Sequence, residues 1–197
     1  MTLSELLNRP AIDPAALAEH LDSLDDAKRI TQTLALSARH QARLFEVVEG
    51  ARPITLEALA PSSAPPLQGL PHQGRNSMYA FTRFTKLFAV PDEPALTTTE
   101  RWGWNRAGPV VENFVGPGYF VVTQQGAEVL VDYRRLPPRP LLGAPPVRSN
   151  ATRLSFFVYN RTSDVVRGVS AHVSVGRAWR GTRRLDNWFV LCRTAAR

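Results

Sequence analysis

The sequence contains a single cysteine, Cys192. It therefore cannot form a disulfide within the chain, which agrees with a reducing compartment. Met1–Pro10 lacks a basic segment followed by an apolar run, so no secretory signal is expected. No stretch approaches the ~20 apolar residues that a membrane-spanning helix needs. The expectation is a cytoplasmic protein with no transmembrane segment.

Motifs that would fix a metal, a nucleotide or a cofactor are also missing. The four histidines, at positions 20, 40, 72 and 172, lack the close spacing that brings metal ligands together. Gly116-Pro117-Gly118 precedes a strand pattern and is not followed by Lys and Ser/Thr, so it predicts a tight turn rather than a phosphate loop. No metal and no cofactor is expected.

Lysine is scarce, with only Lys28 and Lys86 against 22 arginines, a ratio that GC-rich coding also produces. Residues 1–100 carry nine Lys/Arg and twelve Asp/Glu, a balance of −3, whereas residues 101–197 carry fifteen Arg and five Asp/Glu, a balance of +10. Arginine recognises carboxylates and phosphates through two parallel hydrogen bonds, so an anionic partner is expected. A nucleic acid is not expected, because the sequence has no nucleic-acid-binding signature.

The first half of the chain carries helix signals. Asp13-Pro14 predicts a helix start, because Asp caps free N–H groups and Pro fits the first helical position. A second start near Ser23 leads into a helical stripe that runs to Gly50 and is interrupted by Ser37 and Gln41. The expected organisation is N-terminal helices over 1–50, a Pro-rich linker over 51–76 and an antiparallel β domain over 77–197.

Short β-branched and aromatic runs, separated by Gly and Pro, predict seven or eight antiparallel strands. They cover residues 77–90, 96–104, 110–115, 119–124, 127–134, 153–160, 165–178 and 187–193. The first run also fits a helix, because Phe81, Phe84 and Phe88 recur at helical spacing, but its aromatic and Thr content favours a strand. The clearest strand pattern is 165–178, in which Val and Ala alternate with Gly, Ser and His.

These elements predict an α+β fold, in which the N-terminal helical segment packs on an antiparallel sheet curved into a barrel or half-barrel. In outline this order resembles the small lipocalin-like barrels. No residue role follows from that likeness.

His172 is the first candidate for a binding residue, because it is expected in mid-strand on a face of Gly and Ser that leaves room for a ligand. It also fits a solvent-facing strand residue, or one packed under the N-terminal helices. Arg177 and Arg161 are the expected polar contacts. Apolar walls of the cavity are expected from Trp104, Tyr119 and Phe157. Aromatic residues in a sheet, such as Trp104 and Tyr119, more often fill a core. Cys192 is expected to be a buried core thiol.

The leading hypothesis is a non-enzymatic protein that binds a small or lipid-like anionic ligand in a barrel-like cavity. The alternative is a structural or interaction module that forms a homodimer, or that docks an acidic partner through its Arg-rich sheet half. A third hypothesis is an enzyme that uses His172 as acid or base.

Overall fold

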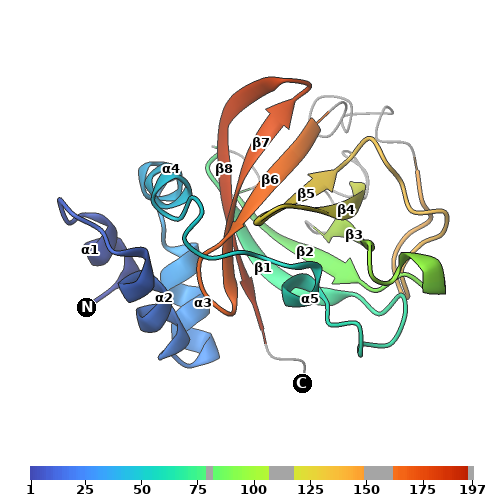
Figure 1. Ribbon diagram of the computed structural model, residues 1–197, viewed down its shortest axis with the longest axis horizontal. Coiled ribbons are helices and arrows are strands. Elements are labelled where there is room, and N and C mark those ends of the chain that lie inside the picture. Colours follow the sequence, from blue (N-terminus) through green and yellow to red (C-terminus); the bar gives the residue numbers. More distant parts are fainter. Residues whose placement is uncertain (79–81, 107–117, 149–161, 195–197) are drawn as a thin grey trace.

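The computed structural model describes residues 1–78, 82–106, 118–148 and 162–194 of the chain. Within these residues, eight antiparallel strands form a closed barrel, each strand pairing with its neighbours in chain order and the last with the first (Figure 1). The strands are β1 (Leu70–Asn76), β2 (Arg83–Ala89), β3 (Glu100–Arg106), β4 (Tyr119–Gln125), β5 (Glu128–Asp132), β6 (Thr162–Gly168), β7 (Val173–Arg180) and β8 (Arg183–Arg193). The α+β class, with helices on an antiparallel barrel, is confirmed.

The α-helices each begin with a residue whose side chain caps the helix. They are α1 (Leu3–Leu7), α2 (Pro14–Asp22), α3 (Asp26–Leu34), α4 (Ala38–Val47) and α5 (Leu56–Leu59), with a 3-10 turn, η1 (Pro94–Leu96), before β3. Asp13 caps α2 by accepting from the Ala15 N–H at 2.9 Å, so the predicted start at Asp13-Pro14 is confirmed.

The expectation of one helix from about Ser23 to Gly50 is wrong, because this stretch forms two helices, α3 and α4. The Ser37 side chain accepts from the His40 N–H and begins α4, so it is a helix cap rather than an interruption of a stripe. Gln41 is buried and donates to the Leu36 carbonyl at the break between the helices. Both residues therefore satisfy backbone groups that a helix break leaves free.

Helices α3 and α4 lie against the outer face of the barrel, beside β7, β8 and β1, and α1 packs on α2, α3 and α4 (Figure 1). Their leucines pack with Val173, Val175 and Val190, which point outward from the strands. Cys192 lies in this layer, where burial raises the pKa of its thiol to about 11. It is the buried core thiol that the sequence predicts.

The barrel begins earlier than expected. The range 51–76, expected as a linker, contains α5 and all of β1. Two prolines misled the sequence reasoning here: Pro61 follows α5, and Pro71 lies within β1. The predicted strands 110–115 and 153–160 lie outside the described residues.

The single strand expected over 165–178 is wrong, because residues 169–172 form a turn between β6 and β7. The Val173 carbonyl accepts from the N–H groups of Val169 and Ser170, and the Asp22 carboxylate accepts from that of Ala171. Gly168 and Ser174, on either side of the turn, are a pair in the ladder. The alternation of residue types therefore stays in phase from β6 to β7. This is why the sequence pattern concealed the turn.

Three glycines make room inside the barrel for three phenylalanine rings. Each glycine is paired across the ladder with the phenylalanine whose ring covers it: Gly74 with Phe84, Gly103 with Phe120, and Gly176 with Phe189. A Cβ added at Gly176 would lie 2.1 Å from the Phe189 ring, and one at Gly103 would lie 2.3 Å from that of Phe120. The interior is therefore packed so closely that these positions exclude any side chain.

We expect Gly176→Ala to lower the free energy of unfolding by about 1–3 kcal/mol, because the new methyl group must displace the Phe189 ring. Urea unfolding measures this cost. In a Phe189→Leu background the same substitution should cost less, since the smaller side chain removes the clash. An equal cost in both backgrounds would show that the ring does not set the requirement for glycine.

Candidate functional site

One end of the barrel is covered by the chain that connects the helices to β1. At this capped end β1 begins and β8 ends. Residues 52–64, here called the covering segment, cross it (Figure 1). Ile54 donates its N–H to the Ala127 carbonyl at 3.0 Å, and its own carbonyl accepts from Gln124 at 2.9 Å. The Arg52 carbonyl lies so near Gly168 that a Cβ there would be only 2.9 Å away. Backbone contacts thus fix the covering segment on the barrel.

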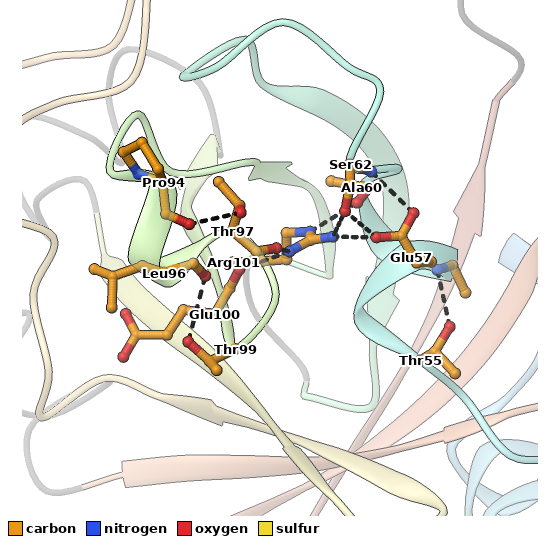
Figure 2. Close-up of polar contacts among 11 residues, drawn as sticks. Thr55, Glu57, Ala60, Ser62, Pro94, Leu96, Thr97, Thr99, Glu100 and Arg101 are labelled. Carbon is orange, nitrogen blue, oxygen red and sulfur yellow. Dashed lines mark hydrogen bonds and ion pairs between the residues drawn. The ribbon is translucent and has the colours of Figure 1, made fainter.

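Arg101 holds the second half of this segment (Figure 2). Its side chain is buried, and its Nε donates to the Ala60 carbonyl at 2.7 Å. One terminal nitrogen donates to the carbonyls of Thr97 and Glu100, and the other to the Glu57 carboxylate and the Ser62 hydroxyl. The five N–H groups of a guanidinium match these five acceptors. Arg101 therefore joins α5, η1 and β3 at one point.

Beneath the covering segment is a pocket of about 280 Å³. Its walls come from Arg52 to Leu59 on one side, and from β1 and the β6–β7 turn on the other. The polar side chains that line it are Arg52, Thr55, His72, Ser170, His172 and Ser174. The serines and His72 are buried, and His172 is half-buried. The pocket is thus a small concave site with several hydrogen-bonding groups.

The two histidines of the pocket are held in their neutral form. His72 projects into the barrel, where its Nε2 donates to the Leu59 carbonyl at 3.0 Å and its ring packs edge-on against Phe88. Burial lowers the pKa of His72 to about 3. Burial also lowers the pKa of His172, and the charges of Arg29 and Arg193 act in the same direction. The Nδ1 atom of His172 is buried with no hydrogen-bond partner in the described part of the chain.

The electrostatic field at the pocket is set by several arginines and two acids. Arg193 disfavours a positive charge on both histidines, whereas Asp22 and Asp26 partly offset this effect at His172. Asp22 is already engaged by the N–H of Ala171. Burial is the largest cause of both pKa shifts, and it disfavours a charge of either sign. The neighbouring arginines disfavour only the positive one.

A second hollow, of about 520 Å³, adjoins the pocket between α2 and the covering segment. The two share Arg52 and Gly168. The second is lined by Asp13, Glu19 and Asp22, so its polar groups are mainly acidic. An anionic group fits the histidine pocket and not this groove.

The structure separates the residues that the sequence proposed as one site. Only His172 lines the pocket, and it lies in a turn rather than in mid-strand. Arg177 projects from the outer face of β7, where it contacts Trp188, the Leu185 carbonyl and Asp186. Arg161 and Phe157 lie outside the described residues.

The remaining two candidates, Trp104 and Tyr119, stack on each other outside the barrel, with ring centroids 6.3 Å apart. The Tyr119 hydroxyl donates to the Pro145 carbonyl at 2.5 Å, and burial raises its pKa to about 12. These two rings fill a core between strands and loops, which is the other interpretation that the sequence left open.

Sequence reasoning missed a buried amine in the barrel interior. Lys86 projects inward from the middle of β2, and its Nζ donates to the Tyr133 hydroxyl at 2.5 Å. The Asp164 carboxylate lies 3.4 Å from Nζ and 3.2 Å from the same hydroxyl. Asn105 also donates to Tyr133, at 3.1 Å. The sequence signal that could have identified Lys86 is its position between phenylalanines in an apolar strand.

No group of His, Cys, Asp or Glu side chains in the described ranges is arranged to hold a metal ion. Among the same residues, no helix has the length and apolar character to cross a membrane. No known protein family, curated protein or solved structure matches the chain. The candidate site is therefore argued from its own geometry.

Arg101→Met should lower the free energy of unfolding by about 3 kcal/mol, because it leaves three carbonyls and a carboxylate without their donor. Urea unfolding tests this, with Glu57→Gln as the control. Glu57 is largely exposed, so its substitution should cost less than about 1 kcal/mol. Similar losses for both variants would mean that the ion pair, and not the backbone contacts, carries the effect.

The low pKa of His72 predicts a dependence of stability on pH. The unfolded chain takes up a proton near pH 6.5, whereas the folded chain does so only near 3. Folding stability is thus fully present above pH 6.5 and falls as the pH decreases through this window, by up to about 1.4 kcal/mol per pH unit. His72→Gln keeps a donor for Leu59, so its unfolding free energy should fall less steeply from pH 6.5 to 4. If the unfolding free energies of the unchanged protein and of His72→Gln depend on pH in the same way, the low pKa of His72 is contradicted.

Proposed function

We propose that the protein binds a small anionic ligand, without chemical conversion, in the histidine pocket at the capped end of the barrel. The observation that carries this proposal is the buried Nδ1 of His172, which has no partner among the described residues, on a residue that lines a pocket of about 280 Å³. A buried polar atom without a hydrogen bond is costly, and a ligand would supply the missing partner.

Charge supports an anion. Arg52 is exposed at the rim, and the fields of Arg29 and Arg193 reach the histidines. A carboxylate or phosphate would accept hydrogen bonds from Arg52 and from the hydroxyls of Ser170 and Ser174. It would also raise the pKa of His172 and so convert its imidazole into a second donor.

Size favours a small molecule over a lipid chain. A volume of about 280 Å³ is at the lower end of the range for ligand pockets. The barrel beyond the pocket is filled by His72 and Phe88, which are almost entirely buried. A long acyl chain therefore has no space in the described interior at this end, and the apolar part of the ligand should be short.

The first experiment is native mass spectrometry of the protein purified from its own host, under gentle and then denaturing conditions. We expect a small anionic molecule that is lost on denaturation. Its binding is then measured by calorimetry, alongside a series of short carboxylates and inorganic phosphate. A neutral or cationic occupant, or no binding by any anion tested, would contradict the proposal.

Substitutions locate the binding. Arg52→Gln and His172→Gln should each weaken binding of the anion by about tenfold, which corresponds to ~1.4 kcal/mol of binding free energy. Arg184→Gln makes the same change of charge at the exposed β7–β8 turn, at the other end of the barrel, and should leave affinity unchanged. Equal losses in Arg52→Gln and Arg184→Gln would point to net charge rather than to this pocket.

A further inference from the structure

The interior of the barrel holds a second site, which the anion proposal does not use. Its centre is the amine of Lys86, whose side chain is only 2% exposed. Four aromatic rings surround this amine, with centroids 4.8 Å (Phe120), 5.0 Å (Tyr133), 5.0 Å (Phe189) and 5.9 Å (Phe84) from Nζ. The amine thus lies in an aromatic enclosure that excludes water.

The polar partners of the amine are suited to proton transfer. The Tyr133 hydroxyl contacts Nζ, the Asp164 carboxyl and the Asn105 amide. Burial lowers the pKa of Lys86 and raises that of Asp164, so the pair tends towards a neutral amine beside a neutral acid. A neutral amine is a nucleophile, and a carboxylic acid and a phenol are proton donors.

One polar atom beside this centre has no partner. The Oδ1 atom of Asn105 is buried and makes no hydrogen bond within the described residues, although its Nδ2 donates to Tyr133. The side chain is 5% exposed. This buried acceptor lies next to an amine and a phenol. A reactant with a hydroxyl group would donate the hydrogen bond that the acceptor lacks. The carbinolamine formed when an amine adds to an aldehyde carries such a group.

The site also lies near one end of the barrel, opposite the capped end. Asn105 is the second-last residue of β3, Asp164 is the third residue of β6, and Tyr133 directly follows β5. These strand ends meet at the same rim in an antiparallel barrel. The polar partners of the amine therefore lie towards this rim.

We propose that Lys86 forms a reversible imine with a small apolar aldehyde, using Tyr133 and Asp164 to move protons. The amine nitrogen attacks the carbonyl carbon, and the oxygen takes a proton from the Tyr133 hydroxyl, which the Asp164 acid replenishes. The nitrogen then loses one proton to the Asp164 carboxylate. Asp164 returns this proton through Tyr133 to the hydroxyl group, which leaves as water, and the iminium that remains loses its N–H proton to Asp164. Amine and aldehyde thus give imine and water, with no change of oxidation state.

The test uses the native chain, benzaldehyde as the probe and sodium cyanoborohydride, which traps an imine as a stable secondary amine. Peptide mapping then compares the chain's only two lysines. Lys28 is exposed and paired with Asp25, and so is the internal reference. At about pH 7 we expect Lys86 to be labelled at least about tenfold faster than Lys28, because more of its amine is neutral.

Variants separate chemistry from access. Tyr133→Phe keeps the ring and removes the hydroxyl, so labelling of Lys86 should slow about tenfold or more while that of Lys28 is unchanged. Lys28→Met should leave the Lys86 rate intact, and Lys86→Met gives the background. Labelling of Lys28 and the N-terminus without Lys86 in the folded protein, or of Lys86 only in urea, would overturn the proposal.

Discussion

The barrel depends on a steric constraint: each of three interior phenylalanines needs a glycine opposite it on the next strand. An eight-stranded barrel has an interior just wide enough for its own side chains. The rings of Phe84, Phe120 and Phe189 fit there because the facing strands offer no Cβ. The same rings lie within 6 Å of the Lys86 amine. The requirement for glycine therefore shapes the environment of the one interior lysine as well as the packing.

That environment is unfavourable for charge. Taking an ammonium and a carboxylate out of water costs several kcal/mol for each ion, and one contact of 3.4 Å between Lys86 and Asp164 recovers only part of it. Apolar side chains of similar volume would often be as stable in such a place. Packing alone thus does not explain the polar centre. The histidine pocket at the capped end is different, because burial and the charges of Arg29 and Arg193 disfavour a positive charge on His172.

Local signals in the sequence predicted the start of α2 at Asp13-Pro14 and the antiparallel class, because caps and turns depend on neighbouring residues. The start expected near Ser23 is wrong, since Ser23 ends α2 and Asp25 caps α3. The turn at 169–172 was hidden because Gly168 and Ser174 keep the same alternation on either side of it. Alternation also cannot tell the inside of this barrel from the outside, since both faces of several strands are buried. Trp104 and Tyr119 were therefore assigned to a cavity wall, although they pack outside. His72 and Lys86 were missed because only the closed sheet brings them together.

Part of the basic excess is used inside the fold. Four arginines of residues 101–197 pair with acids of residues 1–100: Arg101 with Glu57, Arg139 with Asp92, Arg167 with Glu49, and Arg177 with Glu46. Two of them also donate to carbonyls near helix ends, Arg167 to Phe45 and Arg101 to Ala60. The side chains of Arg101 and Arg167 are buried, so these two arginines join the helices to the barrel rather than present charge to a partner.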